Sequence, residues 1–439
     1  MMRLLHQKRG DTHSDRPAIV AHAYLRGAPV SQLGVTFLRF LIACFFSLTA
    51  LFPLQMARSA PSDAPRARVI VLGVDHGTQL VSERDQPGML AAYLKQVQPD
   101  AICIERPPEQ AARGDYYEYT YEVQGIILPY AKASRATLCP IDWMPPVEDA
   151  KLGFGLDLDT PLEIRRPSGF QGFLTFPDRA SLTRDFFAAE DPQNLAAVVH
   201  WATTPAPRAD LDLPRRLYLY RTFLQARRIR AAAIAHPGKT VLVVVGYFHK
   251  PDLDDILSHD PAIELVKASA YDRPDDDAVE AATTTEHLAA ILSFNLLGAQ
   301  AETGIVNWRW VGNVLDRFQA RQQGPEANLL RIRYELLTGR ITLAQASRQF
   351  RHLAAATADD VRFSWTGVQD VLRIDSFFDP FGNLSVRQRA LIELARCQFA
   401  SGDAREADAI IEQVRRTLSP RQALQLTGYA ERLRPNKAP

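Results

Sequence analysis

The stretches "VIVLGVDH" (residues 69–76) and "VLVVVGYFH" (residues 241–249) decide the fold, because each carries a run of apolar residues into a glycine and then a histidine. Near-continuous Val, Ile and Leu without polar alternation is typical of strands that are covered on both faces, as in a parallel or mixed sheet. Three further apolar runs have the same character. The predicted strands are residues 69–73, 101–105, 137–141, 241–246 and 263–268.

Helical stretches separate these predicted strands. They cover residues 88–97, 116–134 and 217–235, in the order expected of an α/β protein. Residues 143–216 interrupt this order, because Pro and Gly are frequent there and only short helical pieces such as residues 191–201 fit. The sequence therefore predicts an α/β domain with a mostly parallel, mixed sheet and helices on both faces. Residues 143–216 are an insertion in this domain, and insertions of this length often form a lid or a substrate pocket.

The C-terminal part of the chain is predicted to be helical. Strand patterns end after "YDRPDDD" (residues 271–277), an acidic stretch that we interpret as a linker. Further on, Gly339 lies five residues before Ala344, and Gly402 lies five residues before Ala407. This spacing resembles a tetratricopeptide repeat, and an ordinary helical hairpin with a glycine turn fits as well. The predicted domains are a targeting segment at 1–59, an α/β domain at 60–275 and a helical domain at 276–439.

The N-terminal region has the pattern of an export signal. Residues 40–54, "FLIACFFSLTALFPL", are apolar or small, and this length suits the apolar core of a signal peptide better than a membrane span of about 20 residues. Small residues then favour cleavage after Ser59, with lipidation at Cys44 and an uncleaved anchor as the alternatives. The protein is therefore expected to be periplasmic or secreted. It would meet the membrane only through the signal segment, and would be membrane-anchored if that segment is not cleaved.

Composition and charge fit a globular protein of more than one domain. The chain has 439 residues, of which 46% are hydrophobic and 23% are charged, and its formal net charge is +1. Because the chain has neither a basic field nor a dense basic cluster among aromatic residues, nucleic acid is not an expected partner. Cys103 and Cys139 fall on two predicted strands, where one disulfide or a pair of buried thiols is compatible with the sequence.

Ionisable side chains end or follow four of the predicted strands. They are His76, Glu105, Asp142 and His249. Because ligands of open α/β sheets bind beyond the carboxyl ends of the strands, we expect these groups to meet at one edge of the sheet. Gly73 and Gly246, three residues before the histidines, would let the backbone turn sharply and leave room for a ligand. The Gly-x-x-His spacing alone carries little information, since it also occurs by chance at residues 10–13.

This set of side chains has the chemistry of a metal site. Two imidazoles and a carboxylate are ligands of catalytic divalent ions, so His76, Glu105 and His249 are predicted to hold Mn, Co or Zn. Such an ion lowers the pKa of a bound water. Without a metal, either histidine can act as general base while Glu105 orients it. A hydrogen-bonded structural role is the competing interpretation of each residue. One shared ion requires the two imidazoles to lie within about 10 Å of each other.

The motifs resemble those of the TraB/PrgY and Tiki superfamily, with ChaN-like and erythromycin esterase-like proteins as more distant relatives. That superfamily has two Gly-x-x-His motifs, a glutamate that ends the second strand, and an arginine on the helix before the last motif. The corresponding residues here are Gly73 with His76, Glu105, and Gly246 with His249. The stretch "RTFLQARRI" places the arginine at Arg221, with Arg227 and Arg228 as alternatives. The resemblance covers residues 69–270 and leaves the helical part unexplained.

The resemblance implies a hydrolase that acts on a peptide or a small molecule. The Tiki branch implies a metal-dependent peptidase, the esterase branch a histidine base, and the ChaN branch haem or iron binding. Glu105 and Arg221 would be catalytic, with Arg221 clamping a substrate carboxylate or stabilising an oxyanion. Asp75 and Asp142 are further candidates for substrate binding. The chain departs from the family at Gln225, where a methionine is usual.

Two alternatives to this interpretation stay open. The helix around Arg221 has an apolar stripe of Leu217, Tyr220, Leu224 and Ala231 that we expect to be buried, so Arg221 can instead belong to a salt bridge or a solvated face. The whole protein can instead be a non-catalytic binding protein. It would then take haem, iron or a small ligand, or recruit a protein partner through its helical region.

Overall fold

A computed structural model describes residues 65–154, 175–209, 211–368 and 370–434. These residues belong to one compact unit that begins at Pro65. The predicted export signal and part of the predicted insertion lie outside the described residues. Within the described part of the chain, no helix combines the length and the apolar character needed to cross a membrane.

The core of the α/β part is a parallel sheet with the strand order β3-β2-β4-β1-β5. All of its strand pairs are parallel, so the α/β class is confirmed, whereas the predicted mixed character of the sheet is not observed. A parallel pair needs a crossover connection, and every consecutive pair of strands here is joined through helix. The strands are β1 (Ala67–Val74), β2 (Ala101–Ile104), β3 (Thr137–Pro140), β4 (Thr240–Gly246) and β5 (Ile263–Val266).

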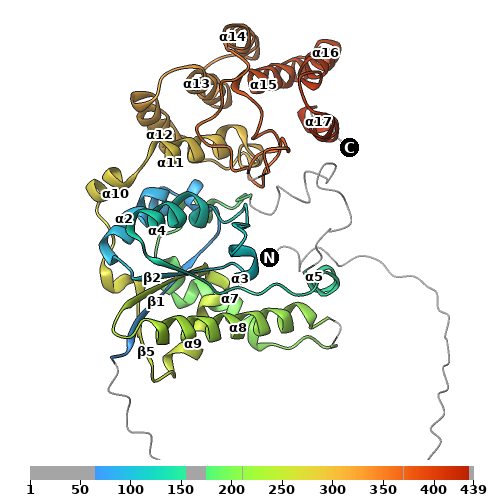
Figure 1. Cartoon of the computed structure of the whole chain (residues 1–439). Helices are drawn as coiled ribbons and strands as arrows, with labels where there is room; N and C mark the ends of the chain where they lie inside the picture. The colour runs from blue at the N-terminus through green and yellow to red at the C-terminus, as the bar shows by residue number, and fades with distance from the viewer. Residues whose placement is uncertain (1–64, 155–174, 210, 369, 435–439) are drawn as a thin grey trace, which may run out of the picture. The chain divides into compact units, whose positions relative to one another are not determined.

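Helices cover both faces of the sheet (Figure 1). On β1, Ile70 and Leu72 point into the core under α2 (Pro87–Val97) and α4 (Leu128–Ser134). Val69 and Val71 point into the second core, under α8 (Leu213–Ala235) and α9 (Lys250–Ser258). Because successive side chains alternate between the faces, a strand buried on both sides must be apolar throughout. This explains the uninterrupted apolar runs of the sequence.

The linker after β5 is shorter than the sequence suggested, because the end of the acidic stretch belongs to a helix. Asp275 caps α10 (Asp276–Ala282) by accepting a hydrogen bond from the N–H of Ala278. Asp276 and Asp277 then lie in the first turn, where the helix dipole favours negative charge. The C-terminal end of α10 packs closely on α2, since a Cβ on Gly88 would lie 2.2 Å from Thr283 Oγ1.

The C-terminal part is helical, as predicted. The helices named in the hairpin prediction are α13 (Pro325–Leu337), α14 (Leu343–Ala356), α15 (Val386–Ala400) and α16 (Ala404–Arg415). Gly339 and Gly402 form the two turns with φ of 73° and 89°, in the left-handed region that favours glycine. Ala407 is fully buried, as expected of an alanine at a tight crossing, whereas Ala344 is exposed and Ala346 is buried in its place. The tetratricopeptide identity of these hairpins stays a prediction.

A buried histidine makes the stability of the helical part depend on pH. His287 accepts a hydrogen bond from the N–H of Thr284 through Nδ1 and also hydrogen-bonds to the backbone of Gly125. Burial lowers the pKa of His287 to about 4. Between pH 6.5 and pH 4, His287 therefore binds a proton in the unfolded chain but stays neutral in the folded chain. The free energy of unfolding is expected to fall by about 3 kcal/mol between pH 6.5 and pH 4.

Urea unfolding at several pH values measures this effect. His287→Gln is expected to remove most of the slope between pH 6.5 and pH 4. His259→Gln, at an exposed position, is expected to leave the slope unchanged. Equal slopes for wild type and His287→Gln would contradict the assignment.

Candidate active site at the carboxyl edge of the sheet

Glu105 is the centre of the candidate site. It follows β2 directly, and its side chain is 5% exposed. The backbone N–H of Gly246 donates to Oε2 at 2.7 Å, and Arg221 Nη2 donates to Oε1 at 2.6 Å. Burial raises the pKa of Glu105, but the charge of Arg221 and the bonds to the neighbouring histidines outweigh it and hold the pKa well below its usual range. Glu105 is therefore a buried carboxylate that stays ionised.

The two strand-end histidines approach the two oxygens of Glu105. His76 Nε2 lies 3.5 Å from Oε2, and His249 Nε2 lies 3.6 Å from Oε1. The register explains this meeting, because β1 and β4 are neighbours in which Val74 pairs with Gly246. The structure thus brings together the three residues predicted to form the site, and both imidazoles lie close enough to meet the distance required for one shared ion.

The second ring nitrogen of each histidine, Nδ1, is held by a hydrogen bond to another side chain. Glu122 Oε1 lies 2.7 Å from His76 Nδ1, so a carboxylate accepts the proton of Nδ1. Thr222 Oγ1 lies 2.7 Å from His249 Nδ1 and donates its own hydrogen to the carbonyl of Tyr218, so it too accepts from Nδ1. Both rings are therefore oriented with Nε2 towards Glu105. Partners of this kind fix the tautomer and the direction of metal-binding or catalytic histidines.

His76 is the more accessible of the two histidines, with 17% of its side chain exposed against 5% for His249. Burial lowers the pKa of His76, but the carboxylates of Glu122 and Glu105 outweigh burial, and the pKa lies well above its usual value. In the site as described, Nε2 of His76 therefore carries a proton near neutral pH. In this state the imidazole is a proton donor, and a general base among the two histidines, which the sequence allows without a metal, stays a prediction.

Asp142 fixes Arg221 and is not placed to bind substrate. Its side chain is fully buried, and Arg221 donates to both of its oxygens at 2.6 Å. Tyr117 and Gln225 donate to the same carboxylate at 3.0 Å. Because every one of these bonds is internal, the geometry favours a positioning role for Asp142 over the predicted contact with substrate. Arg221 is itself buried between Asp142 and Glu105, so it too acts through Glu105 in this structure.

The structure distinguishes Arg221 from the alternative arginines of the same helix. Arg227 is exposed, and Arg228 donates to the backbone carbonyl of Asp142 rather than to a side chain of the site. The prediction that an apolar stripe through Tyr220 is the buried face of α8 is wrong, since Tyr220 is 52% exposed. The buried face carries Tyr218, Arg221, Thr222, Gln225 and Ile229 instead. Polar site residues occupy that face, so a search for an apolar stripe selects the wrong side of the helix.

The two motif glycines are needed for close approach and not for an unusual backbone. Neither has a positive φ. A Cβ on Gly246 would lie 3.1 Å from His76 Nε2 and 3.3 Å from Glu105 Oε2, inside the site. A Cβ on Gly73 would lie 2.7 Å from the Cβ of Ala189. The room predicted for a ligand is thus taken by neighbouring side chains of the protein itself.

Asp75 lies at the rim of the site, where sequence reasoning missed a cationic partner. Arg184 Nη1 lies 3.8 Å from Asp75 Oδ2, and its guanidinium carbon lies 4.6 Å from the ring centre of Tyr247. Asp75 keeps 34% of its side chain exposed, so it remains a candidate for substrate contact. Glu122 was also missed. It lies in the π-helix η4 (Glu122–Ile127), and no period of the sequence marks it.

The candidate site meets only part of what a divalent ion requires. Within the described ranges, no three His, Cys, Asp or Glu side chains are arranged as a ready metal site. The donor types do fit, because two Nε2 atoms with anchored Nδ1 atoms face one ionised carboxylate. An ion held there would share Glu105 with Arg221 and the N–H of Gly246, and would replace the proton on His76.

Cys103 and Cys139 are direct register partners on β2 and β3. Both are free thiols in the structure, with Cys103 fully buried. They therefore belong to the core between the sheet and α8 rather than to the candidate site.

Comparison of the chain with protein-family models, with curated proteins and with solved structures finds no match. The resemblance to the TraB/PrgY and Tiki superfamily therefore depends on the motif residues themselves.

Proposed function

We propose that this protein is an exported hydrolase of the TraB/Tiki type, acting on ester or peptide bonds with the help of a divalent ion. The observation that carries the proposal is the convergence of two strand-end imidazoles on the oxygens of one ionised carboxylate. In this proposal the parallel sheet is a ChaN/erythromycin esterase-like fold. Mn, Co and Zn are the candidate ions, with His76, Glu105 and His249 as ligands.

Each residue of the site has a separate task in the proposed reaction. Arg221 keeps Glu105 ionised and in place, because a buried carboxylate without a partner would take up a proton. Glu122 and Thr222 hold the rings so that Nε2 points to Glu105. A bound ion would supply a water nucleophile near neutral pH. Glu122 Oε2 is buried and has no hydrogen-bond partner among the described residues, so only Oε1 of this carboxylate is used to hold His76.

The rim gives the substrate its first contacts. Asp75 and Arg184 offer one acceptor and one donor beside His76, and Tyr119 packs edge-on against the His76 ring at 5.5 Å. A peptide or a small ester presents carbonyl and amide groups that match such a polar and aromatic rim.

The decisive experiment measures metal binding and hydrolysis on the same preparation. The metal-free protein is titrated with Mn²⁺, Co²⁺ and Zn²⁺ by calorimetry, and each form is assayed against a panel of esters and peptides. We expect about one ion per chain and hydrolysis that a chelator removes. Glu105→Gln is expected to weaken both by about 100-fold, within the range for lost first-sphere or acid–base groups. Glu264→Gln, at an exposed position on β5, is the matched control.

A protein that neither binds these ions nor hydrolyses any member of the panel would contradict the proposal.

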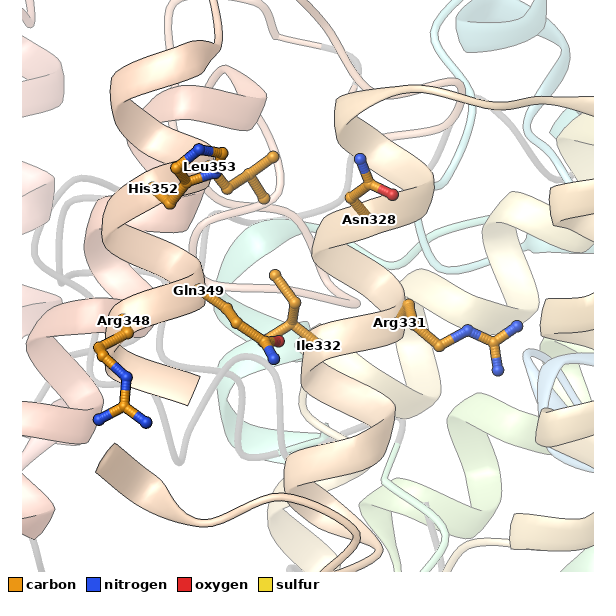
Figure 2. Close-up of a pocket in the computed structure, with 7 residues that line it drawn as sticks. All are labelled: Asn328, Arg331, Ile332, Arg348, Gln349, His352 and Leu353. Carbon is orange, nitrogen blue, oxygen red and sulfur yellow. The ribbon is translucent and has the colours of Figure 1, made fainter. Parts of the chain in front are cut away.

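The second candidate, recruitment of a protein partner, is favoured by one observation in the helical part. A cavity of about 410 Å³ lies between α13 and α14 (Figure 2). It is lined by Asn328, Arg331, Ile332, Arg348, Gln349, His352 and Leu353. In Figure 2, Ile332 and Gln349 reach into the space between the helices.

A further inference from the structure

A second cavity, whose lining includes neither Glu105 nor the two histidines, lies where the segment before η4 meets α11 (Thr285–Leu292) and the loop that follows α14. Its volume is about 290 Å³, close to the lower end of the range of about 300–1,000 Å³ for small-ligand sites. Its principal side chains are Glu118, Tyr121, Glu286, Phe363, Trp365 and Phe378. None of the lining residues that the structure describes is Lys, Arg or His.

Aromatic rings form much of the wall. Trp365 packs edge-on against Tyr121 with ring centres 5.9 Å apart, and against Phe378 with ring centres 5.2 Å apart. Ring faces carry partial negative charge and attract cations, most strongly those of Trp. A cavity with such walls favours a positively charged guest over a negatively charged one.

Two carboxylates add negative charge to these walls. Glu118 lies 3.7 Å from Arg373, so its charge is balanced within the protein. For Glu286, by contrast, the described residues provide no ion pair. Glu286 is exposed and lies in the first turn of α11, where the helix dipole favours its negative charge. At the cavity it therefore offers an ionised carboxylate to a bound cation.

The hydroxyl of Tyr121 is an unused polar group at the same cavity. The residue is 2% exposed, and its OH has no hydrogen-bond partner among the described residues. Buried polar groups are nearly always paired in folded proteins, so this orphan indicates a missing ligand or water. A hydroxyl can accept from an ammonium group while the ring contributes its face.

The walls are fixed before any ligand arrives. Phe378 precedes Asp379, which Arg389 holds through two bonds of 2.8 and 2.9 Å. Ser364 is tied to Glu326 through its N–H and its hydroxyl. Gly125 leaves no room for a Cβ beside the Tyr121 ring, since such an atom would lie 2.9 Å from the ring. Preorganised walls lower the entropy lost on binding.

We infer that this cavity is a binding site for a small organic cation, a primary amine or an alkylammonium group. Glu286 provides the opposite charge, Trp365, Phe363 and Phe378 the aromatic surface, and Tyr121 a hydrogen-bond acceptor. The inference does not depend on the proposed hydrolase, because none of these residues has a role in the site around Glu105. The cavity is nevertheless close to it in sequence, since Tyr121 adjoins Glu122, which holds His76.

Titration of the full chain with tetramethylammonium and n-butylammonium chloride tests the inference. Tryptophan fluorescence and calorimetry follow binding, with tert-butanol as a neutral probe of similar size and sodium chloride as the salt control. We expect saturable binding of the two ammonium ions and none of tert-butanol. Glu286→Gln is expected to weaken binding about tenfold, and Tyr121→Phe about threefold. Glu264→Gln is expected to bind like wild type, and Trp365→Phe to lose the fluorescence change.

Thermal unfolding of each variant confirms that it is folded before it is compared. Equal affinity for tert-butanol and tetramethylammonium would overturn the inference, as would unchanged binding in Glu286→Gln or the absence of saturable binding. Hydrolysis assays on the same preparation are not expected to respond to Glu286→Gln, so the failure of one proposal is separable from the failure of the other.

Discussion

Replacing Arg221 with methionine is expected to lower the free energy of unfolding by about 3–5 kcal/mol, the range seen when one partner of a buried ion pair is removed. Arg221 is buried and donates to Glu105 at 2.6 Å and to both oxygens of Asp142 at 2.6 Å. Without it, the buried carboxylate of Asp142 would lose its ion pair, and Glu105 would keep only the protonated ring of His76 as a cationic neighbour. At least one of them would then take up a proton on folding.

Urea unfolding at neutral pH measures this loss, and Arg227→Met provides the matched control. Arg227 is an exposed arginine on the same helix, so its loss is expected to change the free energy of unfolding by no more than about 0.5 kcal/mol. Arg221→Lys is expected to fall between the two, because an ammonium group keeps the charge but loses the planar fork that serves Asp142. A loss below about 1 kcal/mol for Arg221→Met would show that Arg221 does not compensate these carboxylates.

The second large effect is expected at His76. Under the proposed function, His76→Gln should lower kcat/KM by about 10²–10⁴-fold, whether His76 serves as a metal ligand or as a proton donor. Its ring is the exposed member of the histidine pair, and its Nε2 faces Glu105 at 3.5 Å. The free energy of unfolding should change far less than in Arg221→Met, because glutamine can still donate to Glu122.

His200→Gln, at an exposed position of α7 (Pro192–Thr203), is the control for this activity measurement. Thr222→Val tests the positioning role of Thr222, which holds His249 through Nδ1 at 2.7 Å. It should cost about 10–100-fold in metal affinity or activity, and Thr222→Ser should restore most of it. If His76→Gln and His200→Gln retain equal activity, His76 is not part of the reacting centre.

The strands were predictable because their burial on both faces leaves a plain record in the sequence. Each residue of β4 is buried, so no polar residue interrupts "VLVVV". The parallel order follows from the helices between strands, and it places the carboxyl ends of β1, β2 and β4 together. For this reason His76, Glu105 and His249 could be grouped before their positions were known.

The supporting residues could not be predicted in this way. Thr222 and Gln225 belong to the face of α8 that also carries Arg221, and a helix with polar groups on its buried side has no clear amphipathic period. Glu122 lies on a π-helix, whose side chains do not follow the spacing of an α-helix. Arg184 comes from the insertion and reaches Asp75 across 109 positions of sequence.

By itself the sequence determined the α/β class, the positions of the strands and the edge at which the ionisable groups collect. These features depend on local patterns of burial, which each strand carries in its own residues. Three features depend on how the chain packs: which oxygen each histidine approaches, which arginine keeps Glu105 ionised, and the binding of Asp142 to Arg221. Such contacts join residues 29 to 144 positions apart, and they depend on the packing of α8 and η4 against the sheet. Their pairing is set by three-dimensional proximity, for which no short stretch of sequence contains a signal.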